Sequence, residues 1–239
     1  MSVKPVSWYG LDMKCIIIAG GLFNREQEEG RKLDRFLKKA DLIIAADSGA
    51  NHLKAMGIIP HYIIGDLDSI HPGTREFFEG EKVEFIKYPS RKEKTDTDLC
   101  VSFSLEKGAT DITLAGSTGQ RLDHTLSNIF LLRKLADMNV SARIIDGHNE
   151  IYLLTSSGEN SSGDFHGAAL ELEGSPGEFL SLIPISETVE GITLEGMEYP
   201  LENKTIEFGS SLGVSNRFSG RKAEIFLGKG CLLITKSRD

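Results

Sequence analysis

The sequence predicts a mixed α/β protein. An N-terminal open, mostly parallel, Rossmann-like sheet with helices on both faces is followed by an all-β C-terminal sandwich. Three observations predict this. Apolar runs alternate with helical patterns through the first 150 residues, short segments separated by Gly, Asn and Pro follow, and a Ser/Gly-rich stretch at 156–167 lies between them. The expected domains are residues 13–155 and 165–239.

Six short runs rich in Ile and Val predict the strands of the first domain. Continuous apolar runs are typical of strands that are covered on both faces, as in a parallel sheet. The runs lie at 15–20, 42–47, 62–66, 83–88, 111–116 and 142–146.

Helical patterns connect several of these strands. They lie at 26–39, 97–107 and 122–138, and in the first of them Leu33 and Leu37 share one face. Ligands of open α/β sheets bind outside the carboxyl ends of the strands, so the candidate functional residues are expected there.

The chain after residue 167 has a different pattern. Segments such as GEFLSLIPI and KAEIFLG are short, partly alternating in hydrophobicity, and bounded by turn residues. This pattern is typical of an antiparallel sandwich or barrel, and no helix of normal length is expected there.

Composition and charge disfavour nucleic-acid-binding, membrane and secreted proteins. The chain has 239 residues, 40% of them hydrophobic, and a net charge of −8, which disfavours a general nucleic-acid binder. Its apolar runs are far shorter than the roughly 20 residues of a membrane span. Its N-terminus lacks the apolar core of a signal peptide. The three cysteines are widely spaced, so we expect no disulfide framework and a cytoplasmic location.

Carboxylates gather at the predicted strand ends. Asp47 ends one strand, Asp66 and Asp68 follow the next, Asp96 opens a helix, and Asp123 opens another. Two carboxylates in a Gly-Asp-x-Asp turn repel each other unless a cation lies between them, and oxygen ligands favour Mg²⁺. The alternative for each residue alone is a helix cap or a turn.

Two glycine-containing turns are candidate phosphate sites. AGGLFNR at 19–25 contains Gly20 and Gly21 and follows the first strand. GSTGQRLDH at 116–124 follows the fifth, and its candidate residues are Thr118, Gly119, Gln120 and Arg121. Backbone N–H groups in such turns bind phosphates, and a guanidinium matches phosphate geometry. Neither turn matches a dinucleotide or P-loop fingerprint, so each taken alone favours a tight turn and nothing more.

Three further features have weaker signals. The basic run RKEK at 91–94 is typical of a solvated loop, but it adjoins Asp96 and would also suit a polyphosphate. Ser215 and Asn216 in GVSNRFSG have the spacing of turn residues. His124 is a hydrogen-bonding residue rather than a metal ligand.

Taken together, the motifs resemble the thiamine pyrophosphokinase family. They occur in the family's order: ADSGANHL (46–53), P-x-x-x-I-G-D-L-D-S (60–69), K-x-K-T-D-T-D (92–98), GSTGQRLDHTLSN (116–128) and GVSN (213–216). The resemblance spans roughly residues 15 to 236. Five motifs in register are specific, although each one alone is weak.

The resemblance implies a fold, a reaction and an assembly. The α/β domain would bind ATP and Mg²⁺, the β-sandwich would bind thiamine, and a homodimer would form its active sites between subunits. The pyrophosphoryl group of ATP would pass to the hydroxyethyl oxygen of thiamine, and AMP would leave.

The resemblance also implies residue roles. Asp66, Asp68 and Asp96 would hold the metal, and Asp47 and Asp123 would complete the acidic site. Gln120 and Arg121 would lie by the phosphates. Ser215 and Asn216 would contact the aminopyrimidine of thiamine.

Three positions depart from the family pattern. Ser48 replaces a common Gly, Cys100 replaces a small residue, and the C-terminal aromatic residue that some members place against thiamine is absent. Phe218 is the residue expected to supply an aromatic face instead. Two alternatives to the family's reaction stay open: a pyrophosphokinase acting on another alcohol, such as a hydroxymethylpterin, and a non-catalytic nucleotide-binding dimer.

Overall fold

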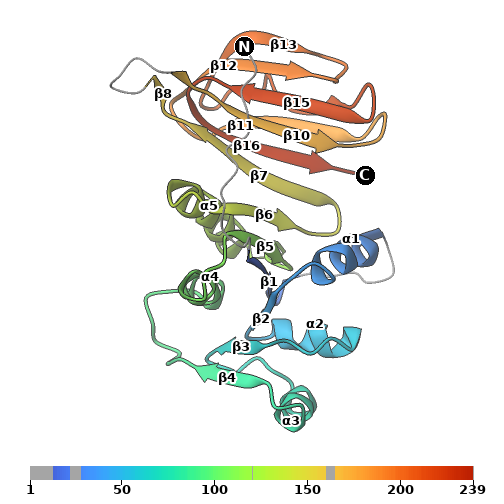
Figure 1. Ribbon diagram of the computed structural model, residues 1–239, viewed down its shortest axis with the longest axis vertical. Helices are drawn as coiled ribbons and strands as arrows, with labels where there is room; N and C mark the ends of the chain where they lie inside the picture. Colours follow the sequence, from blue (N-terminus) through green and yellow to red (C-terminus); the bar gives the residue numbers. More distant parts are fainter. Residues whose placement is uncertain (1–12, 22–27, 120, 160–164, 239) are drawn as a thin grey trace.

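The computed structural model describes residues 13–21, 28–119, 121–159 and 165–238. Its main feature is a ten-stranded sheet with the order β14-β11-β16-β7-β6-β5-β1-β2-β3-β4 (Figure 1). Strands β1 to β6 are all parallel to one another. Their bounds are β1 (Lys14–Ile18), β2 (Leu42–Ala46), β3 (Tyr62–Gly65), β4 (Glu84–Lys87), β5 (Asp111–Ala115) and β6 (Ser141–Ile145). All six strands match the predicted runs.

Helices cover both faces of the parallel strands. One core cluster joins the sheet to α4 (Asp96–Glu106) and α5 (Leu122–Asp137), and the other joins it to α1 (Glu28–Leu37), α2 (Gly49–Met56) and α3 (Pro72–Gly80). In β1, Ile17 faces the first cluster while Ile16 and Ile18 face the second, and all three are buried. Burial on both faces explains why the strand is apolar throughout.

The sequence analysis did not predict α2 and α3. Each spans fewer than ten residues, and α2 has no side-chain cap, while α3 begins with Pro72. Such short helices carry too few apolar positions to show a helical period, and packing on the sheet stabilises them instead.

The C-terminal part is a sandwich of two antiparallel sheets. A four-stranded sheet contains β10 (Ala168–Glu173), β15 (Lys222–Leu227), β12 (Thr188–Glu195) and β13 (Leu201–Glu207). It packs on the end of the ten-stranded sheet, which contains β7 (Asn149–Ser156), β16 (Gly230–Ser237), β11 (Phe179–Pro184) and β14 (Asn216–Arg217). A short hairpin joins β8 (Gly158–Glu159) to β9 (Phe165–His166). No helix occurs after Asp137 within the described residues, as expected.

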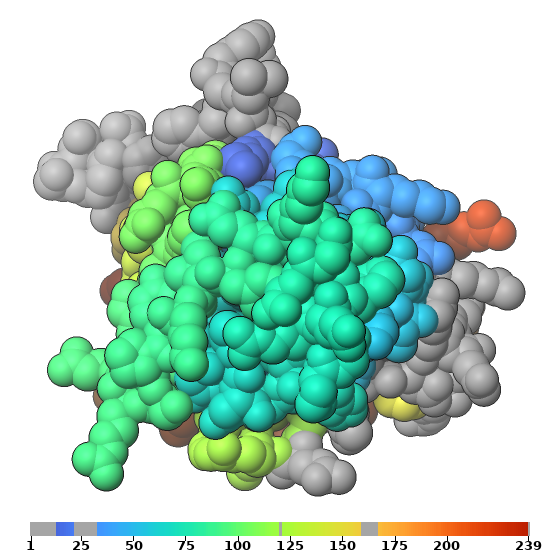
Figure 2. Space-filling view, turned by 90° about the horizontal axis from the view of Figure 1, so that it is seen from below, coloured from blue at the N-terminus to red at the C-terminus, as the bar shows by residue number. Residues whose placement is uncertain are grey.

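One backbone sheet connects the two parts of the protein. β7 pairs with β6 on one side and with β16 on the other, antiparallel in both cases. One sheet of the sandwich is therefore a continuation of the parallel sheet. The two parts lie at opposite ends of the molecule, and the end view is formed mainly by segments from α2 to α4 (Figures 1 and 2). Within the described residues, no helix has the length and apolarity needed to cross a membrane.

Candidate active site

A cleft of about 720 Å³ lies at the carboxyl ends of the parallel strands. The ends of β1, β2, β3 and β5 meet there, which is where an open α/β sheet binds ligands. Nine of the predicted site residues line it: Gly20, Gly21, Asp47, Asp66, Asp68, Asp96, Thr118, Gly119 and Arg121. Their segments are far apart in the sequence, and the parallel register brings them together.

Three carboxylates form the centre of this cleft. Asp47, Asp66 and Asp68 each present an oxygen atom, and these atoms lie within 4.8 Å of one another. Two backbone turns produce the arrangement, because Asp47 has a φ of 46° and Leu67, between the other two, has a φ of 66°. Non-glycine residues rarely adopt this conformation, and it concentrates at functional sites.

A glycine at the end of β3 allows a fourth carboxylate to approach. A Cβ atom on Gly65 would lie 2.9 Å from Cβ of Asp47 and 3.0 Å from Oδ1 of Asp96. Asp96 is held at the first turn of α4, where the Thr95 hydroxyl caps the helix by accepting a hydrogen bond from the Asp98 N–H. The Asp96 side chain therefore packs against the ends of β2 and β3.

Lys92 lies among these acids. Its Nζ is 2.7 Å from Oδ1 of Asp96 and 3.6 Å from Oδ2 of Asp66, and its side chain is only 12% exposed. Burial lowers the pKa of Lys92, but the carboxylates outweigh burial and raise it. Burial raises the pKa of Asp66, but the Asp68 N–H and the Lys92 charge lower it overall.

The local charge favours a further cation. Burial raises the pKa of Asp47, and the charges of Asp96 and Asp66 add to that effect. Oδ1 of Asp47 is buried and accepts no hydrogen bond from any residue that the structure describes. A buried carboxylate oxygen without a partner is costly, and a hard divalent ion would satisfy it. The donor set fits such an ion.

The two predicted glycine turns are in contact. The Gly21 N–H donates to the Gly116 carbonyl at 2.7 Å. A Cβ on Gly21 would lie 2.2 Å from the Thr118 carbonyl oxygen, so only glycine allows this approach. A side chain of α5 also holds the second turn in place, since the Asn128 amide donates to the Ser117 carbonyl at 2.6 Å. Gln120 lies outside the described residues.

Arg121 and Asp123 are at the rim. They form an ion pair of 2.6 Å, and their side chains are 70% and 64% exposed. Arg121 lines the cleft, whereas Asp123 does not. The structure thus brings four of the five predicted carboxylates together and leaves Asp123 paired with Arg121.

The predicted thiamine residues lie in the sandwich, away from the acidic cleft. Ser215 has a φ of 62°, and its N–H donates to the Ser181 hydroxyl. The Asn216 side chain accepts from the Tyr199 N–H at 3.1 Å and donates to the Tyr199 carbonyl at 2.7 Å. Neither residue lines the acidic cleft.

The expectation for Phe218 is wrong. Its ring is 1% exposed, and it belongs to the core between the two sheets of the sandwich. It cannot offer a face to a ligand. The exposed aromatic residue beside Asn216 is Tyr199, which is 69% exposed.

The sequence analysis gave no individual role to two residues that contact the site. The first is Lys92, which it described only as part of a basic run. The second is His52, whose Nε2 lies 3.0 Å from the Gly21 carbonyl oxygen. The signal for Lys92 was the position of the basic run in the loop directly before Asp96. His52 belongs to the motif ADSGANHL, but it was given no role of its own, because α2 was not predicted.

Comparison with known proteins gives consistent results along the chain. Residues 33–144 match the family described as thiamin pyrophosphokinase, catalytic domain, and residues 169–232 match thiamin pyrophosphokinase, vitamin B1 binding domain. The chain is 34% identical to the thiamine pyrophosphokinase of Bacillus subtilis (strain 168), over 95% of this chain and 100% of that protein.

Solved structures agree with these matches. The crystal structure of the B. subtilis enzyme superposes with a TM-score of 0.78 at 31% identity, covering 95% of this chain and 99% of that one. The thiamin pyrophosphokinase of Geobacillus thermodenitrificans superposes with a TM-score of 0.76 at 28% identity, covering 95% and 98%.

Proposed function

We propose a specific mechanism on the premise that this chain belongs to the thiamine pyrophosphokinase family. The protein is an enzyme that forms thiamine diphosphate. In the proposed reaction, the pyrophosphoryl group of ATP passes to the hydroxyethyl oxygen of thiamine and AMP leaves. The observation that carries the mechanism is the convergence of four carboxylates, Lys92 and two glycine turns at one edge of the sheet.

The acidic cluster is the proposed Mg²⁺ site. Asp66, Asp68 and Asp96 would hold the ion, and Asp47 would add a further carboxylate. The close approach of three carboxylate oxygens and the partnerless Oδ1 of Asp47 support this assignment. Bound Mg²⁺ would neutralise the charge of the triphosphate, which otherwise repels an acidic site.

Lys92 has two proposed roles. Its ammonium group partly neutralises Asp66 and Asp96, which sets the affinity of the cluster for a divalent ion. It also presents a positive charge at the place where the phosphates arrive. Phosphoryl transfer depends mainly on positioning and on charge stabilisation, so this placement would contribute to the rate.

The glycine turns and Arg121 are the proposed phosphate-binding elements. Gly20 and Gly119 both line the cleft, so phosphate groups bound there would lie against their backbone. Arg121 would exchange its exposed partner Asp123 for a phosphate group. Gln120, in the same turn, keeps the role that the family resemblance gives it.

Thiamine is proposed to bind at the sandwich turn that contains Ser215 and Asn216. The hydrogen bonds of Asn216 to both backbone groups of Tyr199 make it a positioning residue for that segment. We assign the aromatic contact with thiamine to the exposed Tyr199. The negative charge of the C-terminal part suits a cationic acceptor, since residues 151–239 contain 7 Lys and Arg against 13 Asp and Glu.

A homodimer would bring the two half-sites together. Two exposed apolar surfaces support it: the α5 stripe of Leu122, Leu126 and Phe130, and the rim of Phe208, Leu212 and Val214 next to Ser215. The first adjoins the phosphate turn and the second adjoins the thiamine turn. In a C₂ dimer, packing the stripe of one subunit on the rim of its partner would complete two sites at once.

The test is direct. Purified protein incubated with ATP, Mg²⁺ and thiamine should yield thiamine diphosphate and AMP in equal amounts. Hydroxymethylpterin in place of thiamine should give no AMP, since the C-terminal part matches a vitamin B1 binding domain. AMP release with the pterin alone would overturn the assigned acceptor.

The proposed location is the cytoplasm. Cys15, Cys100 and Cys231 are all buried and unpaired, which suits a reducing compartment. Burial raises the pKa of Cys100 well above its usual value, so it is inert, and it packs as a small apolar residue in the core.

A further inference from the structure

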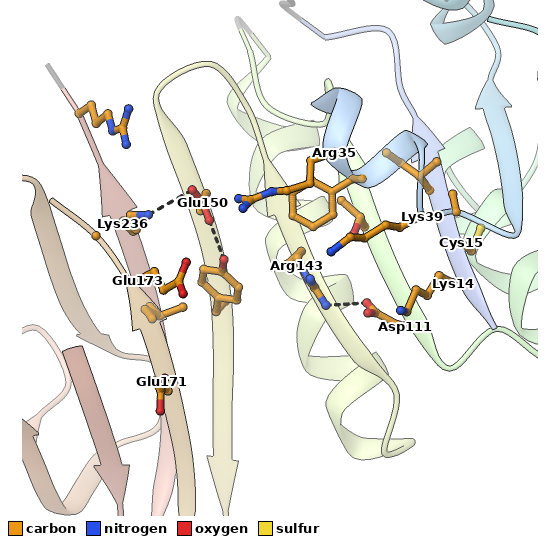
Figure 3. A pocket seen from close by; sticks show the side chains of 18 of the residues that line it. Lys14, Cys15, Arg35, Lys39, Asp111, Arg143, Glu150, Glu171, Glu173 and Lys236 are labelled. Atoms are coloured by element: carbon orange, nitrogen blue, oxygen red, sulfur yellow. Dashed lines mark hydrogen bonds and ion pairs between the residues drawn. The ribbon is translucent and has the colours of Figure 1, made fainter. Parts of the chain in front are cut away.

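A second cleft lies at the other end of β1 from the acidic site. It has a volume of about 740 Å³ and is lined by α1, by the strands β1, β5, β6 and β7, and by β10 of the opposite sheet (Figure 3). From β1 it is lined by Lys14, Cys15 and Ile16, whereas the acidic cleft begins at Ala19. No residue lines both clefts.

The second cleft is rich in cationic side chains, although the protein has a net charge of −8. Four of its charged residues are compensated by neighbours. Arg143 pairs with Asp111 at 2.6 Å, Glu171 pairs with Lys222 outside the cleft, and Arg238 pairs with Glu178.

Two cations on the α1 side lack such compensation. Arg35 and Lys39 extend from the end of α1 over the cleft (Figure 3). Among the described residues, neither forms an ion pair. Glu171 and Glu173 on β10 are the acidic groups of the opposite wall, and Glu171 is already paired with Lys222. An anion would therefore lie on the α1 side of the cleft.

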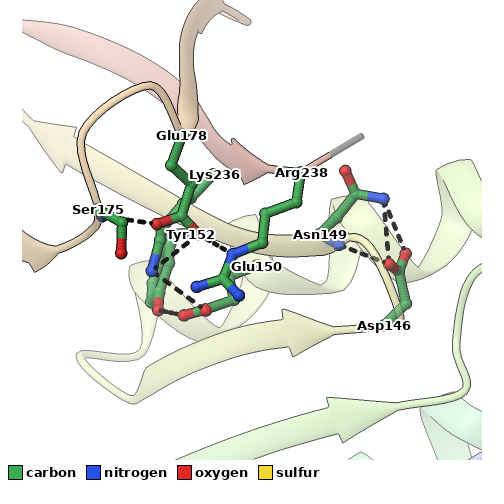
Figure 4. A network of polar contacts seen from close by, with 8 residues as sticks. All are labelled: Asp146, Asn149, Glu150, Tyr152, Ser175, Glu178, Lys236 and Arg238. Atoms are coloured by element: carbon green, nitrogen blue, oxygen red, sulfur yellow. Dashed lines mark hydrogen bonds and ion pairs between the residues drawn. The ribbon is translucent and has the colours of Figure 1, made fainter. Parts of the chain in front are cut away.

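The inner end of the cleft contains a buried ammonium group. The Lys236 side chain is 9% exposed, and its Nζ lies 3.4 Å from Glu150 and 3.6 Å from Glu178 (Figure 4). Both distances exceed those of a normal charged hydrogen bond. The carboxylates have closer donors, because Glu150 accepts from the Tyr152 hydroxyl at 2.7 Å and Glu178 accepts from the Ser175 N–H at 2.9 Å. Lys236 can thus take a further acceptor.

We propose that this cleft is a second binding site, for a small anion that carries several linked phosphate groups. A chain of phosphates can contact Arg35 and Lys39 together and reach toward Lys236, which a single carboxylate cannot do. The volume lies within the range of ligand-binding clefts. The site is distinct from the catalytic mechanism proposed above, and its cations bind phosphate without a metal ion.

Independence from metal separates the two sites in an experiment. In excess EDTA the acidic cleft repels polyphosphate, whereas the second cleft retains its cations. Binding of inorganic triphosphate would be measured by calorimetry at low salt, in EDTA, for the wild type, the double variant Arg35→Gln/Lys39→Gln and the control Lys38→Gln. Lys38 is an exposed neighbour that does not line the cleft.

The proposal expects one metal-independent site in the wild type and in Lys38→Gln, with affinity at least about tenfold weaker in the double variant. All three side chains are exposed, so the variants should fold, and their melting temperatures check this. Absence of binding in EDTA, or equal binding by the double variant, would overturn the proposal. Thiamine diphosphate formation is assayed separately. If that assay fails, the triphosphate-binding measurement still tests the second cleft by itself.

Discussion

The acidic cleft and the sandwich turn satisfy their polar groups in opposite ways. In the cleft, Asp47 and Leu67 hold left-handed backbone conformations, and Oδ1 of Asp47 accepts no hydrogen bond from the described residues. In the sandwich turn, the Asn216 side chain is fully engaged by the backbone of Tyr199. The carboxylates of the cleft need a bound cation to balance their charge. The polar groups of the sandwich turn are already hydrogen-bonded, and the turn exposes apolar surface.

This difference indicates how each region contributes to function. Carboxylates held together at a strand end act through charge, so their removal should affect rate and leave the fold intact. The sandwich turn acts through shape, and it needs the other half-site beside it. The predictions that follow test this contrast, from the largest expected effect to the smallest.

The largest effect is expected from the metal-binding carboxylates. Asp66→Asn and Asp68→Asn should each slow turnover by about 100- to 1,000-fold, by analogy with the loss of one preorganised hydrogen-bond donor. The control is Asp98→Asn on α4, because Asp98 pairs with Lys134 outside the cleft. Turnover would be measured at saturating Mg²⁺. Wild-type rates in either cleft variant would refute the metal assignment.

Mixed dimers test whether the two regions meet across subunits. Asp66→Asn and Asn216→Ala should each have little activity alone. After subunit exchange, about half of the dimers are mixed, and each mixed dimer has one intact site, so activity should recover to about one quarter of the wild-type value. If exchange is demonstrated by mass spectrometry and activity stays absent, each site lies within one chain.

Lys92 should affect metal binding and rate in opposite directions. Lys92→Gln removes the charge beside Asp66 and Asp96, so Mn²⁺ should bind about tenfold more tightly while thiamine diphosphate forms more slowly. Lys94→Gln is the matched control, because Lys94 donates to the Ser102 hydroxyl. Calorimetry with Mn²⁺ gives the affinity. Equal affinities in wild type and Lys92→Gln would leave Lys92 without this role.

Two aromatic residues of the sandwich should separate stability from binding. Phe218→Ala should lower the free energy of unfolding by about 3–5 kcal/mol, because the ring fills the core. Tyr199→Ala should leave unfolding unchanged and raise KM for thiamine by about tenfold. Urea denaturation and steady-state kinetics provide the two measurements. An unchanged KM in Tyr199→Ala would remove Tyr199 from the thiamine site.

The smallest effect is expected at the rim. Arg121→Lys should lower kcat/KM for ATP by about five- to tenfold, since lysine lacks the planar fork that matches a phosphate group. The assay would be run with thiamine saturating. A variant with the wild-type value would show that Arg121 serves only its ion pair with Asp123.

The sequence by itself determined the elements whose signals are local. Burial on both faces makes a parallel strand apolar throughout, so the strands could be found. Helices α1, α4 and α5 are long enough to carry a helical pattern, although the pattern of α4 is less regular. The acidic residues of the cleft could also be predicted, because strand ends of a parallel sheet share one edge. The short α2 and α3 gave no such signal, and His52 on α2 was therefore given no role of its own.

Only the tertiary structure decided which side chains meet. Ionic contacts are short-ranged and depend on side-chain direction, so the sequence could not show that Lys92 turns into the acidic cluster or that Asp123 pairs with Arg121 outside it. The burial of Phe218 depends on a second sheet that packs on the first. The continuity of the sheet through β7 depends on pairing with β16, which lies far along the chain. Pairing between strands far apart in the chain cannot be predicted from a local sequence pattern, because the register is set only when both strands lie side by side.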